Sequence, residues 1–182
     1  AAWALSEVNG VYQIGTAEDL VAFAELVNGE NPYACAILTA DIEKPATDVS
    51  MIGRSGQDFQ GTFDGAGHTI TIDLYSQGAE GTALFRNIGV HGIVQNLKVQ
   101  GKITSDQKLA AGIAAWNSGI IRGCYVDVEV SSAFAGDATH GGIAAVGYRG
   151  TVVENCLAKF VIKGATTQNC GGLVGWASDP VN

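Results

Sequence analysis

Gly-Ile-Ala-Ala at Gly112–Ala115 returns as Gly-Ile-Ala-Ala at Gly142–Ala145 and as Gly-Leu-Val-Gly at Gly172–Gly175. Leu84 holds the same place one unit earlier: the step from Leu84 to Ile113 is 29 residues, and the next two steps are 30 residues each. A fixed period of this length is typical of stacked-repeat proteins, in which each unit buries its apolar face against its neighbours. The repeat therefore predicts a solenoid.

A second segment of each unit alternates between apolar and polar residues. The three segments are Lys98–Ile103, Tyr125–Val130 and Leu157–Ile162. Alternation with a period of two predicts strands with one buried face. We expect four inward columns, each with one residue per unit: Leu97, Cys124 and Cys156; Val99, Val126 and Ala158; Gly101, Val128 and Phe160; and Ile103, Val130 and Ile162.

The outward positions of these segments carry opposite charges on successive units. Lys102 should lie beside Glu129, and Asp127 beside Lys159, if the units stack in register about 4.8 Å apart. Exposed pairs of this kind contribute roughly 0–1 kcal/mol each. They are therefore evidence of register more than of stability.

Two short strands per coil, β-branched inward residues and glycine-rich corners predict an all-β solenoid, a right-handed parallel β-helix. No helical periodicity occurs after residue 75, which argues against a helical or leucine-rich solenoid. Earlier in the chain, Thr16–Asp19 resembles a capping box, and apolar residues follow at helical spacing until Gly29. These apolar residues are Leu20, Phe23, Ala24 and Val27. We expect an N-terminal amphipathic capping helix over about 17–28, covering the open end of the stack.

One elongated domain is expected, because the 182 residues include 25 glycines and only three prolines. Residues 1–58 are interpreted as the N-terminal cap, with strands at Val11–Ile14 and Ala34–Leu38. The first coil should contain Phe59–Phe63 and Thr69–Leu74. The expected coils are about 59–80, 81–110, 111–140 and 141–170, followed by an incomplete coil at 171–182. Because the repeat breaks off in mid-pattern, we expect further coils or a cap in the natural protein.

The composition limits the partners of the protein. The net charge is −8 and the pI about 4.7, so no basic stripe could release counterions from nucleic acid. No run of eighteen apolar residues is present. We expect no nucleic-acid binding and no membrane insertion, and we interpret the chain as a mature or excised part of a longer protein.

Four cysteines are present, at Cys35, Cys124, Cys156 and Cys170. Cys124 and Cys156 share an inward column at a spacing that a disulfide tolerates. Cysteine also behaves as a small apolar core residue, and we favour free buried thiols over a Cys124–Cys156 bridge. Cys35 and Cys170 stay unassigned.

Several motifs resemble the GLUG-motif repeat proteins. They are Gly61–Ile70, Ala83–Phe85, Gly112–Cys124, Gly141–Cys156 and Gly171–Gly175, with Tyr12–Asn28 and Leu38–Ile42 resembling the segment that precedes such repeats. The resemblance covers nearly the whole chain and implies a bacterial cell-surface or secreted protein, with the repeats as a noncatalytic β-helical region beside other domains. Zinc metallopeptidases that cleave immunoglobulin A1 carry similar repeats, but their His-Glu-x-x-His motif is absent here.

The chain departs from that family at several positions. Ala115 and Ala145 replace the family's glycine, and Gly123 replaces the asparagine that is present at Asn96 and Asn155. The departure at Gly123 interrupts the stack of corner asparagines that the resemblance implies.

No constellation of catalytic residues is evident. Inverting hydrolysis needs two carboxylates about 6.5–9.5 Å apart, yet Asp127 and Glu129 each have a lysine neighbour in the expected register. Asp106 and Asp137 recur in equivalent loops, where turn formation is favoured over a calcium site. His68, His91 and His140 occupy unrelated positions of different coils, which argues against a metal cluster. We expect no catalytic residues, no metal and no cofactor.

The candidate binding residues are aromatic. Trp116, Val146 and Trp176 should occupy the same outward place in three successive coils, with Tyr148 two residues after Val146. Rows of exposed aromatic residues often mark a binding face, and flat rings suit sugar rings. Packing against a neighbouring domain and cover by loops are the alternatives for Trp116, Tyr148 and Trp176.

The leading hypothesis is a noncatalytic extracellular β-helix module of a larger bacterial surface protein, serving as a stalk or adhesion surface. Its candidate partners are a glycan, a host surface protein and neighbouring domains of the same polypeptide. The alternative is a polysaccharide-degrading enzyme with pectate-lyase-like architecture, either a lyase or a glycoside hydrolase.

Overall fold

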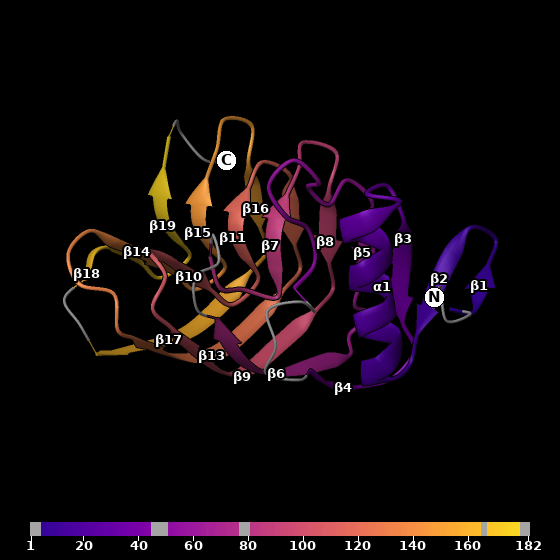
Figure 1. Ribbon diagram of the computed structural model, residues 1–182, viewed down its shortest axis with the longest axis horizontal. Coiled ribbons are helices and arrows are strands. Elements are labelled where there is room, and N and C mark those ends of the chain that lie inside the picture. Colours follow the sequence, from indigo (N-terminus) through magenta and orange to yellow (C-terminus); the bar gives the residue numbers. More distant parts are fainter. Residues whose placement is uncertain (1–4, 45–50, 77–80, 165–166, 179–182) are drawn as a thin grey trace.

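The computed structural model describes residues 5–44, 51–76, 81–164 and 167–178. The protein is an all-β solenoid, a parallel β-helix with one helix at its N-terminal end (Figure 1). The fold class expected from the repeat is therefore confirmed. The expected ends of the first coil, at residue 80, and of the last coil, at residue 182, lie outside the described residues.

Each coil of the repeat region has four strands in a fixed order. The first coil consists of β8 (Ile93–Gln95), β9 (Lys98–Ser105), β10 (Leu109–Ala111) and β11 (Ala114–Asn117). The second consists of β12 (Ile120–Arg122), β13 (Tyr125–Ser132), β14 (Ala138–Gly141) and β15 (Ala144–Gly147). The third consists of β16 (Val152–Glu154), β17 (Leu157–Gly164), β18 (Thr167–Gly171) and β19 (Val174–Ala177).

The expectation of two strands per coil was wrong. Three-residue strands such as β12 are too short to show alternation, and every residue of β14 is buried, so its sequence has no polar face. A period of two is detectable only where a strand is long and has one solvated side.

The equivalent strands of successive coils pair in parallel and form four sheets among the described residues, with a register shift between Ala138 and Thr139 where β14 pairs with β18. The strands before the repeat coils are β1 (Glu7–Val8), β2 (Val11–Ile14), β3 (Cys35–Leu38), β4 (Ile42–Lys44), β5 (Thr62–Asp64), β6 (Thr69–Ser76) and β7 (Phe85–Ile88). The sheet orders are β1-β2-β3-β5-β8-β12-β16, β17-β13-β9-β6-β4, β19-β15-β11-β7 and β10-β14-β18. Because β2 and β3 belong to the same sheet as β16, strands of the N-terminal segment extend the solenoid.

The inward columns predicted from the alternation are confirmed. Val128 on β13 pairs with Gly101 on β9 and with Phe160 on β17, and the flanking columns follow the same register. Val128 is 1% exposed. The sheet of β9, β13 and β17 therefore supplies a continuous apolar wall to the core.

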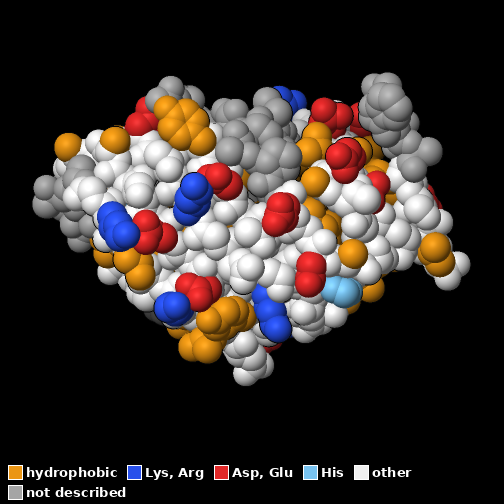
Figure 2. Space-filling model, turned by 90° about the horizontal axis from the view of Figure 1, so that it is seen from below, with side chains coloured by type: hydrophobic (Ala, Val, Ile, Leu, Met, Phe, Trp, Pro, Cys, Tyr) orange, Lys and Arg blue, Asp and Glu red, His pale blue; other side chains and the backbone are white. Residues whose placement is uncertain are grey.

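One of the two predicted ion pairs is present. Lys159 Nζ lies 3.2 Å from Asp127 Oδ2, as expected. Lys102 is opposite Glu129 in register but forms its ion pair with Asp73, at 3.5 Å, and Glu129 pairs with Lys163 at 2.8 Å. Long side chains on adjacent strands reach diagonal as well as direct neighbours. Figure 2, a view from below, shows basic and acidic side chains lying side by side on this face.

The N-terminal helix α1 (Ala17–Gly29) is anchored by its cap and by its apolar face. Thr16 Oγ1 accepts a hydrogen bond from the Asp19 amide at 3.1 Å, and Asp19 Oδ2 accepts one from the Thr16 amide at 3.0 Å. The predicted apolar residues are all buried: Leu20, Phe23, Ala24 and Val27. The ring of Phe23 lies 5.9 Å from that of Phe63 and 6.2 Å from that of Phe59, so the helix packs directly on β5 and on the residues just before it.

The corner before the long strand of each repeat coil has a left-handed backbone. Asn96, Gly123 and Asn155 have φ angles of 54°, 61° and 51°. Asparagine and glycine both tolerate this region of φ. The glycine at position 123 therefore removes a side chain from the corner but keeps its geometry.

Candidate functional site

Two aromatic rings lie stacked on one side of the solenoid. Trp116 is on β11, in register with Asn87 on β7 and with Val146 on β15. Tyr148 follows β15, and its ring lies parallel to that of Trp116, with centroids 5.4 Å apart and an interplanar angle of 9°. Such an aromatic pair contributes about 0.5–1.5 kcal/mol beyond the burial of its area.

A tight turn holds Tyr148 in place. The Thr151 amide donates to the Tyr148 carbonyl at 2.9 Å, and Gly150 has a φ of 85°. The Tyr148 amide and the Thr151 hydroxyl both donate to the Asn117 carbonyl, at 2.9 Å and 2.6 Å. These contacts fix the backbone on both sides of the ring, so the stack is built into the coil.

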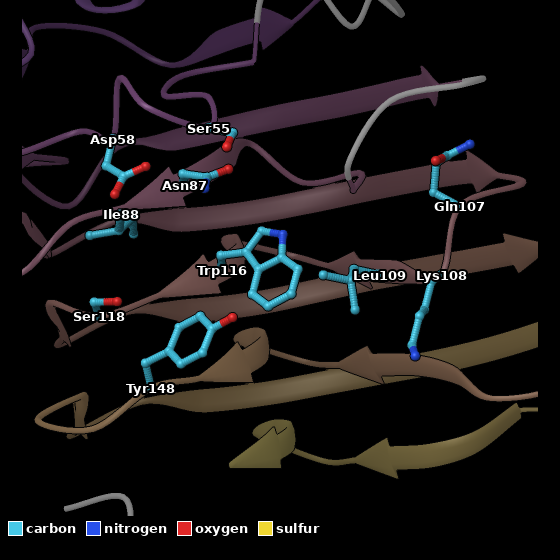
Figure 3. Close-up of a pocket in the computed structure, with 10 residues that line it drawn as sticks. All are labelled: Ser55, Asp58, Asn87, Ile88, Gln107, Lys108, Leu109, Trp116, Ser118 and Tyr148. Atoms are coloured by element: carbon cyan, nitrogen blue, oxygen red, sulfur yellow. The ribbon is translucent and has the colours of Figure 1, made fainter. Parts of the chain in front are cut away.

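The stacked rings form part of the wall of a cavity of about 520 Å³ (Figure 3). This volume is within the range of small-molecule pockets, roughly 300–1,000 Å³. The lining residues combine aromatic, aliphatic and polar side chains: Ser55, Asp58, Asn87, Ile88, Gln107, Lys108, Leu109, Trp116, Ser118 and Tyr148.

The polar side chains of this pocket come from segments that are separate in sequence. Lys108 Nζ lies 2.5 Å from Asp137 Oδ2, and the hydrogen bond from Lys108 holds the pKa of Asp137 below its usual range. The side-chain oxygen of Asn87 is buried and has no hydrogen-bond partner among the described residues. A buried acceptor without a partner is costly to the folded state.

The predicted row of three outward residues is in register, but it does not form one surface. Val146 pairs with both Trp116 and Trp176, as expected. However, Val146 is 3% exposed, and it belongs to a small second core with Ala115 and Ala145. Trp176 is 48% exposed and does not line the cavity. The structure thus brings Trp116 and Tyr148 together and leaves Trp176 apart.

The other titratable candidates lie outside this pocket. His68 Nδ1 lies 3.3 Å from Asp41 Oδ1, the His91 ring lies beside Tyr33, and His140 is buried in the core. Within the described residues, no three His, Cys, Asp or Glu side chains lie close enough together to hold a metal ion. No helix in that part of the chain is long and apolar enough to cross a membrane.

Of the ten lining residues, the sequence reasoning named Trp116 and Tyr148; the residues that it missed include Asp58, Asn87 and Lys108. Asp58 comes from the loop between β4 and β5, Asn87 from β7 and Lys108 from the position directly before β10. They do not occupy one position of the repeat, so periodicity gives no signal for them. Only the stacking of coils places them beside Trp116.

The comparison with known proteins gives one weak likeness. The chain is 30% identical to halomucin of Haloquadratum walsbyi over 128 residues, which cover 65% of this chain and 1% of halomucin. It therefore corresponds to a very small part of that protein. No family model and no solved structure matches the chain.

Proposed function

We propose that this chain is a noncatalytic extracellular module that binds a sugar ring of a glycan in the Trp116 pocket. The observation that carries this proposal is the Trp116–Tyr148 stack at a cavity that also contains Asp58, Asn87 and Lys108. The solenoid would present this pocket as part of a stalk or adhesion surface.

The chemistry of a sugar matches this wall. A hexose has a face of C–H groups, which packs on an aromatic ring, and a rim of hydroxyls, which need donors and acceptors. Tyr148 covers one face of the indole, and Trp116 is partly buried, so a ligand would contact the part of the indole that lines the cavity. Asp58 supplies an acceptor, and Lys108 supplies a donor.

The extracellular setting is part of the same proposal. It is supported by the resemblance of the repeats to GLUG-motif proteins, to which we assign this chain as a hypothesis, and by the likeness to halomucin, whose name identifies it as a mucin. The net charge of −8 favours solubility.

A polysaccharide-degrading enzyme is the alternative, and the pocket favours it less. Glycoside hydrolysis by the common mechanisms needs two carboxyl groups across the scissile bond. Among the described residues that line the cavity, Asp58 supplies the carboxylate and Lys108 is held by Asp137. Release of reducing ends or unsaturated products from any polysaccharide by the purified protein would contradict the noncatalytic assignment.

The binding proposal is tested with a glycan array, followed by titration of the strongest ligand into the protein. Trp116→Ala should weaken binding at least tenfold, because it removes the ring that packs on the sugar. Trp176→Ala is the matched control and should bind like the wild type, since Trp176 does not line the cavity. Circular dichroism should show that both variants keep the fold.

Two results would overturn the proposal. One is unchanged affinity of Trp116→Ala for the array ligand. The other is a failure of the wild type to bind any glycan, with Trp116 and Tyr148 buried instead against a neighbouring domain of the full-length protein.

A further inference from the structure

Two thiols lie side by side on successive coils, away from the Trp116 pocket. Cys124 follows β12 and Cys156 follows β16. The residue pairs on either side are in register: Arg122 with Glu154, and Tyr125 with Leu157. The Leu157 amide also donates to the Cys124 carbonyl at 3.0 Å. Neighbouring strands lie about 4.8 Å apart, which is within the Cα separation that a disulfide tolerates.

The two sulfur atoms differ in exposure and in environment. Cys124 is 2% exposed, whereas Cys156 is half-buried, and both are free thiols. Cys124 Sγ donates to the Arg122 carbonyl at 3.3 Å, and Cys156 Sγ donates to the Glu154 carbonyl at 3.2 Å. The neighbouring Cys124 side chain lowers the pKa of Cys156 to about 7, although burial opposes the shift. The Cys156 side chain and burial raise the pKa of Cys124. Cys156 therefore ionises first, while Cys124 keeps its proton.

We propose that Cys124 and Cys156 are a reactive dithiol that exchanges with small-molecule disulfides to form a cross-link between two successive coils. The two thiols have unlike roles in this reaction. Cys156, the more accessible sulfur, is the attacking thiol, and the buried Cys124 is the resolving thiol.

The exchange is balanced with the small disulfide as oxidant. The Cys156 thiolate attacks one sulfur of the disulfide, a mixed disulfide forms on Cys156, and one small thiolate leaves. Cys124 then loses its proton and attacks the sulfur of Cys156, and the second small thiolate is expelled. The two protein thiols are oxidised to a disulfide, and the small disulfide is reduced to two thiols that take up the released protons.

The cross-link would join the third repeat coil to the second. The inward residues Phe160 and Ile162 of the third coil are only partly buried, whereas Val128 and Val130 of the second coil are fully buried. A covalent link at the start of β17 restricts the opening of this less protected coil. Oxidation would thus raise the free energy needed to open the third repeat coil locally.

The test is incubation of the full chain with oxidised glutathione at pH 7.5, followed by peptide mapping under nonreducing conditions. We expect a peptide pair that joins Cys124 to Cys156, with a mass lower by two hydrogen atoms, and we expect Cys35 and Cys170 to stay in the reduced state. A pair that stays reduced, a final product with glutathione on Cys156, or a link to another cysteine would each overturn the proposal.

Variants separate the two roles. Cys124→Ser should stop at the mixed disulfide on Cys156, Cys156→Ser should leave Cys124 unreacted, and the control Cys35→Ser should form the cross-link at the wild-type rate. The rate at which iodoacetamide alkylates Cys156 should rise to half its maximum near pH 7. In Cys124→Ser this midpoint should move to the alkaline range of ordinary thiols. An unchanged midpoint would show that Cys124 does not activate Cys156.

Discussion

At the scale of single residues, the corners of the coils show how a position selects its side chain. Asn96, Gly123 and Asn155 share a left-handed backbone, which most side chains adopt only at a cost. An added Cβ at Gly123 would lie 3.1 Å from Asn96 Oδ1, the end of a movable side chain, so space is limited but adjustable. The positive φ is therefore the stronger constraint at this corner.

Substitutions at Gly123 should follow this constraint. Gly123→Asn is expected to change the free energy of unfolding by less than about 1 kcal/mol, because asparagine adopts the left-handed region locally. Gly123→Val should destabilise the protein by about 1–2 kcal/mol or more, since a β-branched side chain is strained at positive φ. Urea denaturation measures both changes. Equal stability of the two variants would contradict the argument.

His140 is a second residue with a distinctive environment. It is fully buried, it is in register with Ala110 and Cys170, and neither ring nitrogen has a hydrogen-bond partner among the described residues. Burial disfavours the charged imidazolium, so the pKa of His140 is lowered from its usual value. Folding therefore favours the neutral ring.

The stability of the protein should depend on pH through His140. Below about pH 6.5, the unfolded value, the unfolded chain takes up a proton on His140, whereas the folded protein keeps the ring neutral because its pKa is lowered. The free energy of unfolding therefore falls as the pH decreases below about 6.5. The lowered carboxyl pKa values of Asp64 and Asp137 stabilise the folded state above about pH 4, and this stabilisation is lost mainly below that pH. His140→Leu should remove the loss of stability between about pH 6.5 and pH 4, as measured by thermal unfolding. A variant with the wild-type pH profile would contradict this assignment.

At the scale of elements, helix α1 depends on both of its anchors. The capping box supplies partners for amides of the first turn, and Phe23 packs among the rings of Tyr12, Phe59 and Phe63. Packing should contribute more than the cap, because one fully buried phenylalanine outweighs one exposed hydrogen bond.

Two substitutions compare these anchors directly. Thr16→Ala should lower the free energy of unfolding by about 1 kcal/mol, and Phe23→Ala by about 3–5 kcal/mol. Chemical denaturation measures both, with Glu25→Ala on the exposed face of the helix as the neutral control. A larger loss for Thr16→Ala than for Phe23→Ala would show that the cap, and not packing, holds the helix.

At the scale of the whole molecule, burial decreases along the solenoid axis. Strand β13 lies between β9 and β17, and its inward residues are buried. In the third repeat coil, Leu173 is 44% exposed and Trp176 48% exposed, and β19 pairs only with β15 among the described strands. Each coil of a solenoid is stabilised by its neighbours, so local stability should follow this gradient.

Hydrogen exchange should reveal that gradient. Amides of residues 171–178 are expected to exchange fastest among the paired strands, and amides of β13 slowest. Both segments are measured in one sample of dilute protein, so β13 is the internal reference. Equal protection of β13 and β19 would contradict a stability that depends on neighbouring coils.

The sequence by itself determined the period of the coils, the inward columns, the register of the long strands and the position of the capping helix. The strands and the helix follow from periodicity within one segment, and the period and the register follow from the comparison of successive repeats. Gly101, Val128 and Phe160 could be aligned from the repeat alone. The short buried strands, such as β14, could not, because they lack a polar face.

Only the tertiary structure decided which side chains meet across coils. Lys102 could pair with either neighbouring strand, and the structure selects Asp73. Trp116 stacks on Tyr148 and shares a cavity with Asp58 and Lys108, whereas Trp176 in the same register does not. The physical reason is that the register fixes only the positions of the paired backbones. The contacts between side chains of different coils also depend on the loops, whose sequences differ, and on the side-chain rotamers. The candidate pocket therefore arises from the stacking of coils, and no single repeat contains it.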